Sequence, residues 1–172
     1  MAITSEMYLS GGPYDSSCVV DSVNGFPIGD KAVTSSFVAS MISSLITSGV
    51  VLVDGSEFSV VPESGLKITI NPGCAWMKGY MARLDNAYTV NLSAGHNYMV
   101  VLRQNYGLGE CALYVFEDTY GSSPVRFNGV YDLVLAKIKI PSGTMVLSTS
   151  MITDTRRNNS YCGLVKSKVP AE

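Results

Sequence analysis

Three residues in the last third of the chain have types and spacing that could do chemistry. Asp132 and Asp154 lie at the edges of apolar, strand-forming runs, and Arg156 follows Asp154 by two positions. A carboxylate in an apolar setting needs a partner, and residues two apart on an extended chain point to the same side. We therefore interpret Asp132, Asp154 and Arg156 as a structural pairing that fixes the last strands, in preference to catalytic groups.

The other reactive side chains form no recognisable catalytic or metal-binding pattern. His96 is the single histidine and lies in a turn sequence, Ser93 belongs to no nucleophile elbow, and Glu117-Asp118 is typical of a solvated strand end. The cysteines are Cys18, Cys74, Cys111 and Cys162. Their separations are far wider than those of the cysteine pairs that bind zinc. We expect buried thiols, no metal or other cofactor, and no enzymatic activity.

Two aromatic residues, Trp76 and Tyr80, suggest a different chemistry, the stacking of sugar rings. Alternation along one extended run would place both rings on the same face, with Tyr88 or Tyr98 nearby. A lone tryptophan in a β-domain also packs in the core. The sequence therefore allows either a glycan-binding surface or a core position for Trp76.

The composition indicates a domain whose surface is partly covered by a partner. Of the 172 residues, 15% are charged and 47% hydrophobic, whereas charged residues make up about 25% of ordinary soluble domains. The formal net charge is −2 and the basic residues are scattered, so the basic stripe that nucleic acid requires is missing. The N-terminus lacks a signal-peptide pattern and no apolar run is long enough for a membrane span. We expect synthesis in a cytoplasm and no membrane insertion.

The elements that must position these residues begin with an arm and a helix. Residues 1–29 are rich in Ser, Gly and Pro, which predicts an extended arm. Residues 30–49 predict an amphipathic helix, with Asp30 as N-cap and Gly49 as the stop. One face carries small polar residues instead of the usual charges: Ser36, Ser40, Ser43, Ser44 and Thr47. We interpret this face as a contact with another subunit. The alternative is a solvent-facing surface of small polar groups.

Residues 50–165 predict β-structure almost throughout. Short runs rich in Val, Ile, Tyr and Leu are separated by Gly, Pro and Asn turns. The expected strands cover residues 50–53, 58–61, 66–70, 87–92, 97–104, 110–116, 131–140 and 145–147. The first two flank Asp54-Gly55 as a hairpin. This pattern is typical of an antiparallel β-sandwich or barrel-like domain, and residues 166–172 follow it as a C-terminal tail.

Three segments carry a further signal through their order and spacing. The first is the helix opening at residues 30–34 with Gly49-Val50. The second is the run from Leu66 to Tyr80, which contains Gly73-Cys74-Ala75-Trp76 and Gly79-Tyr80. The third leads from Tyr131 through Ile152-Thr153-Asp154-Thr155-Arg156 to Cys162-Gly163. Together they resemble the N-terminal module of tail-fibre, baseplate and receptor-binding proteins from tailed bacteriophages.

The resemblance implies a structural virion protein. It would be an attachment or connector module, a homotrimer that docks onto other virion proteins of the tail, baseplate or capsid. Its place would be the virion, assembled in the cytoplasm of the host bacterium. Two alternatives stay open: a carbohydrate-binding module that recognises a host-surface receptor, and a head fibre or capsid-decorating protein.

Overall fold

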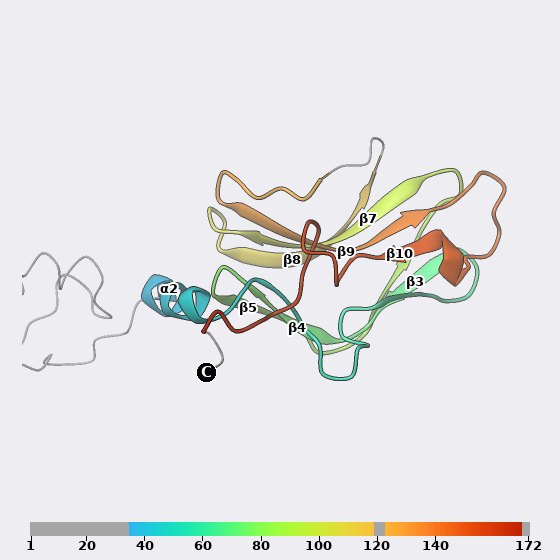
Figure 1. Ribbon diagram of the computed structural model, residues 1–172. Coiled ribbons are helices and arrows are strands. Elements are labelled where there is room, and N and C mark those ends of the chain that lie inside the picture. The colour runs from blue at the N-terminus through green and yellow to red at the C-terminus, as the bar shows by residue number, and fades with distance from the viewer. Residues whose placement is uncertain (1–34, 119–122, 170–172) are drawn as a thin grey trace, which may run out of the picture.

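The computed structural model describes residues 35–118 and 123–169, and these form a mainly β domain with a helix at one end (Figure 1). The helix is α2 (Ser35–Leu45). The strands are β1 (Gly49–Val51), β2 (Val60–Pro62), β3 (Lys67–Ile70), β4 (Gly73–Met77), β5 (Tyr80–Leu84), β6 (Tyr88–Asn91), β7 (Asn97–Asn105), β8 (Glu110–Glu117), β9 (Val130–Lys139) and β10 (Ile152–Asp154). The predicted fold class is confirmed. The arm expected over residues 1–29 and the Asp30 cap lie outside the described residues.

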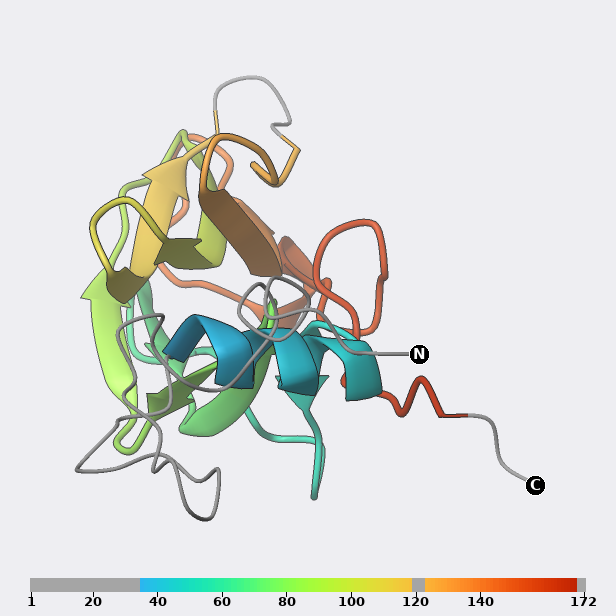
Figure 2. The same cartoon turned by 90° about the vertical axis from the view of Figure 1, so that its left-hand side faces the viewer.

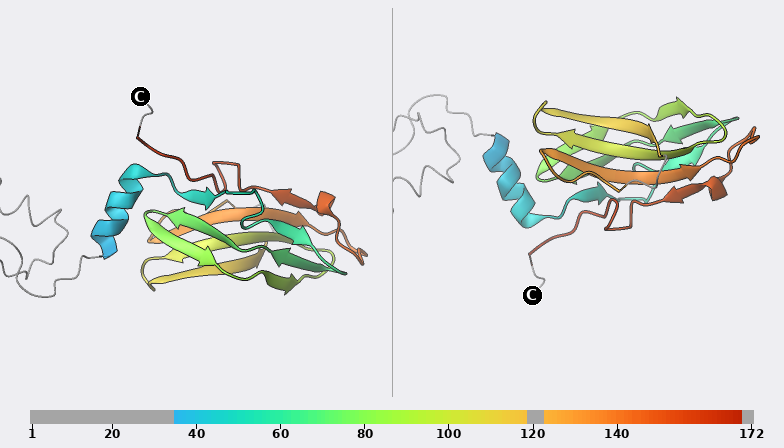
Figure 3. Two further views of the ribbon diagram at one scale, coloured as in Figure 1. Left: turned by 90° about the horizontal axis from the view of Figure 1, so that it is seen from below. Right: turned by 90° about the horizontal axis from the view of Figure 1, so that it is seen from above.

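The strands form two layers. One layer is a four-stranded sheet in the order β10-β9-β7-β8. The other contains two three-stranded sheets, β1-β4-β5 and β2-β3-β6. All of the strand ladders are antiparallel. Figures 1 and 3 show the layers lying face to face, with β4 and β5 on one side and β7 to β10 on the other.

The core fills the space between the layers because every second side chain of the long strands points into it and is apolar. Val100 and Leu102 of β7 and Leu133 and Leu135 of β9 are buried there, against residues of both smaller sheets. The intervening residues of the four-stranded sheet form a second apolar cluster on its outer face, Met99, Val101 and Val134, against which Phe116 and Tyr161 pack. Period-two alternation therefore places apolar side chains on both faces of this sheet.

The hairpin predicted around Asp54-Gly55 is wrong. β1 pairs with β4, and β2 pairs with β3, so the chain crosses between the two smaller sheets at this loop. The loop is closed by its own side chains: the Glu57 carboxylate accepts hydrogen bonds from the backbone N–H groups of Val53, Asp54 and Gly55 at 2.7, 2.9 and 3.0 Å. Phe58 then leaves the loop with a φ of 53°. These local bonds replace the cross-strand bonds of a hairpin.

A hairpin that the sequence did not reveal lies inside the run from Cys74 to Leu84. Lys78 and Gly79 have φ angles of 52° and 85°, as a two-residue turn between antiparallel strands requires. β4 and β5 therefore pair, with Met77 opposite Tyr80. The strand expected at residues 145–147 is also absent, although Leu147 is buried. Its place beside β9 is taken by β10, which follows a 3₁₀ turn at Thr149–Met151.

Helix α2 ends at Leu45, four residues before the predicted stop. The chain beyond it pairs with the C-terminal segment, since the Thr47 N–H donates to the Lys166 carbonyl at 2.9 Å and Ile46 bridges Ser167. Gly49 instead begins β1, where a Cβ atom would lie 2.5 Å from the Gly163 carbonyl oxygen. The predicted tail therefore runs beside the helix end as far as the described residues extend. Figure 2 views the molecule from this end, with α2 in front.

Candidate functional site

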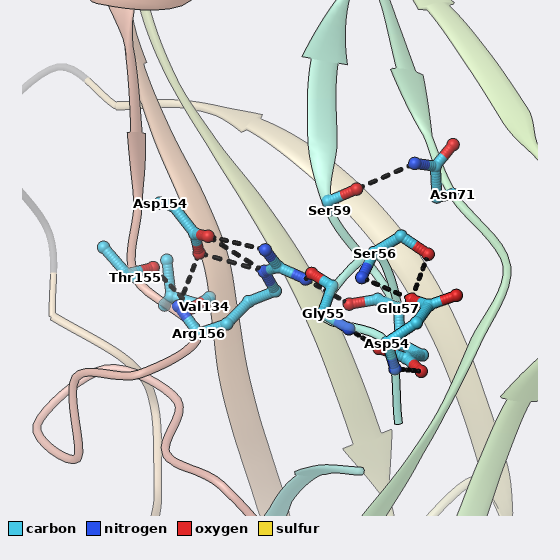
Figure 4. Close-up of polar contacts among 10 residues, drawn as sticks. All are labelled: Asp54, Gly55, Ser56, Glu57, Ser59, Asn71, Val134, Asp154, Thr155 and Arg156. Carbon is cyan, nitrogen blue, oxygen red and sulfur yellow. Dashed lines mark hydrogen bonds and ion pairs between the residues drawn. The ribbon is translucent and has the colours of Figure 1, made fainter. Parts of the chain in front are cut away.

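The predicted pair of Asp154 and Arg156 forms at the end of β10 (Figure 4). Arg156 Nη2 lies 2.7 Å from Asp154 Oδ2, and Nε donates to Oδ1 at 3.0 Å. The other end of the guanidinium, Nη1, donates to the Gly55 carbonyl at 3.0 Å and to the Glu57 carbonyl. Arg156 therefore joins β10 to the loop between β1 and β2, about a hundred residues earlier in the chain.

The surroundings of this pair are structural. The Thr155 hydroxyl donates to the Val134 carbonyl at 2.6 Å, which ties the same segment to β9. Burial acts to raise the pKa of Asp154, but the hydrogen bonds and charge of Arg156 outweigh it and hold that pKa below its ordinary value. The side chain of Asp154 is 50% exposed and that of Arg156 9%. All three nitrogens of the Arg156 guanidinium therefore donate to groups of the same molecule.

Asp132 lies apart from this pair, so the predicted grouping of three residues is wrong in this respect. Its carboxylate accepts two hydrogen bonds from Arg103, Nε to Oδ1 at 2.7 Å and Nη2 to Oδ2 at 2.9 Å. Arg103 stands directly opposite Asp132 in the β7–β9 register, and its guanidinium lies over the rings of Tyr114 and Phe116. Sequence reasoning missed Arg103 because its partner is 29 residues away. Only the strand register brings them together.

Trp76 and Tyr80 do not form a shared platform. The turn at Lys78 and Gly79 reverses the chain between them, so Trp76 pairs with Met81 and Tyr80 pairs with Met77. Residues paired across antiparallel strands point to the same face, and Met77 is fully buried in the core whereas Met81 is 54% exposed. The two rings therefore lie on opposite faces of the sheet. Tyr80 makes an edge contact with Tyr106, with ring centroids 5.4 Å apart.

The side chains of His96 and Glu117 make an exposed hydrogen-bonding contact at the end of the four-stranded sheet, with Nδ1 and Oε1 2.7 Å apart. The neighbouring Asp118 is buried, so the prediction of a solvated Glu117-Asp118 terminus holds only for Glu117. Nearby, the backbone N–H of Ser93 donates a hydrogen bond to the Tyr98 hydroxyl at 3.1 Å. In the described part of the chain, no hydrogen bond links the Ser93 side chain to His96.

The described cysteine thiols are poor nucleophiles. Desolvation by neighbouring groups raises the pKa of Cys74 and of Cys111, and burial raises the pKa of Cys162 to about 12. Such thiols stay protonated at neutral pH, whereas thiolates are the reactive form. The prediction of buried thiols is confirmed for Cys162 and is wrong for Cys111, which is exposed; Cys74 is half-buried. Cys18 lies outside the described residues.

The surface that stands out is helix α2, which projects from one end of the sandwich (Figure 3). It rests on the β4–β5 turn through Ala39, whose backbone leaves no room for a Cβ atom at Gly79. Two of its apolar side chains remain about half exposed, Met41 at 49% and Leu45 at 47%. A helix as short as these 11 residues is marginal in water unless an apolar face is packed. The helix therefore has an apolar surface that the described chain leaves uncovered.

The polar side chains predicted to contact a partner lie around these apolar residues. The hydroxyls of Ser43 and Ser44 donate back to the Ser40 and Met41 carbonyls at 3.1 and 2.7 Å. Serines bonded in this way need no water or partner for their hydroxyl hydrogens. Thr47 instead donates to the Leu164 carbonyl at 2.9 Å, within the same molecule. The side chain of Ser36 lies outside those described.

Within residues 35–118 and 123–169, no helix has the length and apolar character to span a membrane, and no group of three or more His, Cys, Asp or Glu residues could hold a metal ion. Comparison with protein-family models and with curated proteins finds no match.

Proposed function

We propose that this protein is a structural virion protein of a tailed bacteriophage, an attachment or connector module of the tail fibre or baseplate that docks onto neighbouring copies. The observation that carries the proposal is helix α2, which projects from the sandwich with Met41 and Leu45 half exposed. Its described sequence, SSFVASMISSL, contains no charged residue. Interface centres are depleted of charge in the same way.

The energetics favour a covered helix. Burying a methionine or leucine side chain completely stabilises a protein by about 1.5–3 kcal/mol. Covering the exposed half of Met41 and of Leu45 would thus contribute about 1 kcal/mol for each side chain in each copy. Three copies meeting around α2 would bury six such side chains. The back-bonded serines add little desolvation cost to this contact.

The assignment to a phage virion rests on the sequence resemblance, and one structural relationship supports it. Described residues of the three segments lie near one another at the helix end of the sandwich: Gly49 of the first, Lys78 and Gly79 of the second, and Gly163 of the third. The β4–β5 turn contacts α2 at Ala39, the Lys78 N–H donates to the Ser48 hydroxyl at 2.9 Å, and Gly49 lies against Gly163. An assembly role through α2 would require residues that carry the resemblance to lie near this helix, as these do.

The test is the mass of the purified full-length chain by light scattering after size exclusion. We expect three times the chain mass of 18.4 kDa, and a shift to the monomer mass when Met41 and Leu45 are both replaced by lysine. Met145→Lys is the matched control, because Met145 is 84% exposed and lies in the loop after β9. It should leave the mass unchanged. A monomer at high concentration for the unaltered protein would refute the oligomeric role.

A further inference from the structure

A second feature of the helix end is a pocket of about 380 Å³ whose charged lining is entirely basic. It lies between the chain that follows α2, the β4–β5 turn and the C-terminal segment, the region that faces the viewer in Figure 2. Its cations are Lys78, Arg126, Lys166 and Lys168. These are four of the twelve Lys and Arg residues of a chain whose net charge is −2. No Asp or Glu is among the described residues that line it.

These positive charges are held in place without being neutralised. Lys78 Nζ and the Arg126 guanidinium both lie over the Tyr131 ring, 5.3 and 5.2 Å from its centre. Arg126 also donates to the Tyr161 carbonyl at 3.1 Å. An aromatic ring or a carbonyl orients a cation but carries no opposite formal charge. None of the four cations takes part in an ion pair among the described residues.

Stabilisation of the helix accounts for one of the four cations. Lys168 Nζ donates to the Ser43 carbonyl in the last turn of α2, where a positive charge is favourable. Lys166 makes its described hydrogen bond through its backbone, from N–H to the Thr47 hydroxyl at 2.8 Å. Its ammonium group therefore has no helix-capping contact that would explain its position, and the same holds for the Lys78 ammonium and the Arg126 guanidinium.

We propose that this pocket is an anion-binding site for a ligand that bears several phosphate or carboxylate oxygens. Cations gathered in a recess with low-dielectric walls concentrate anions, and multidentate oxyanions gain charge-assisted hydrogen bonds from such donors. The volume lies within the range of small-ligand sites, about 300–1,000 Å³. The inference does not rest on the proposed assembly role, because the four cations are distinct from Met41 and Leu45, although Ser43 and Thr47 of the predicted partner-contact residues also line the pocket.

The anionic ligand has two candidate sources, which the experiment distinguishes. One is a free polyanion. The other is the protein's own N-terminal region, because residues 1–34 carry four carboxylates, Glu6, Asp15, Asp21 and Asp30, against one lysine, Lys31. Such a carboxylate-rich segment, from the same or a second copy, would compete with a free anion for the pocket.

The experiment is calorimetric titration of the full chain with inorganic pyrophosphate at low ionic strength, where screening is weak. We expect binding that weakens about tenfold or more in the double variant Lys78→Gln, Lys166→Gln, as the loss of charge-assisted contacts requires. The control with the same change in charge is Lys67→Gln, Lys139→Gln, which should bind as the unaltered protein does. The single variant Lys166→Gln should fold normally, because the Lys166 ammonium group has no described contact, and it therefore separates a loss of binding from a loss of folding.

A second arm identifies the source. In a full chain with Glu6→Gln, Asp15→Asn, Asp21→Asn and Asp30→Asn, pyrophosphate binding tighter than in a chain with the same change of charge at four exposed carboxylates, Glu63→Gln, Asp85→Asn, Glu110→Gln and Glu117→Gln, would show that the N-terminal carboxylates occupy the pocket. Equal binding by these two chains would show that the ligand is external. Both results support the site. Absence of binding both in the unaltered chain and in the chain without the four N-terminal carboxylates, or an equal loss in the control variant, would overturn it.

Discussion

Removing Arg156 should destabilise the fold more than removing its partner Asp154. In Arg156→Met the long apolar stem is retained, but the Gly55 and Glu57 carbonyls lose their donor. Each such loss costs about 1–2 kcal/mol in a partly solvated position. The Asp154 side chain is 50% exposed, so water can replace its lost partner. We expect a total of about 2–4 kcal/mol.

Substitution of the partner, Asp154→Asn, should lower the free energy of unfolding by about 1 kcal/mol or less. Its amide oxygen can still accept a hydrogen bond from Arg156, and ion pairs with an exposed partner contribute little. Arg157→Met is the matched control, since Arg157 is exposed, and surface changes usually stay within about 0.5 kcal/mol.

The assay is equilibrium unfolding in urea, followed by the fluorescence of Trp76, the single tryptophan of the chain. With a slope of about 2 kcal/mol per molar urea, the midpoint of Arg156→Met should fall by about 1–2 M. A midpoint for Asp154→Asn as low as that of Arg156→Met would refute the reasoning. It would mean that the ion pair stabilises the loop and the carbonyl contacts do not.

Further predictions concern the helix, the pH and the thiols. Gly79→Ala should lower the melting temperature, because Gly79 has a φ of 85° and an added Cβ atom would collide with the Ala39 backbone. Stability should fall as the pH drops below about 3.9, the ordinary pKa of an aspartate. Asp154 has a lowered pKa in the folded chain, so its contribution is complete above that pH and is lost as the folded form takes up its proton. In native protein, iodoacetamide should modify Cys111 before Cys162, because Cys111 is exposed whereas Cys162 is buried and has a pKa of about 12. Peptide mass analysis measures the two rates of modification. Equal rates would contradict the described burial of Cys162.

The long strands could be predicted from the sequence because alternation is a local property. β7 and β8 differ from the expected ranges by one residue at one end, and β9 by one residue at each end, since each strand has enough residues for the pattern to repeat. The β4–β5 hairpin was missed because Lys78-Gly79 interrupts an apolar run without the Asn-Gly or Asp-Gly pair that usually marks such a turn. That single turn moved Trp76 and Tyr80 to opposite faces.

The candidate sites were predictable only where their residues are close in sequence. Asp154 and Arg156 are two positions apart, so the geometry of an extended chain was enough to pair them. Arg103 and Asp132 meet through strand register, and the basic pocket gathers residues from four separate stretches of chain. No local pattern encodes such contacts. The helix surface lay between these cases: its lack of charge was visible in the sequence, but the exposure of Met41 and Leu45 was not.

The most direct test of the proposed role is quantitative mass spectrometry of purified phage particles from cells that produce this protein. The account predicts that the chain remains with the particles through density-gradient purification, in a fixed number of copies per particle that is a multiple of three. Particles that lack the chain, while the same lysate contains it in soluble form, would contradict a structural role in the virion.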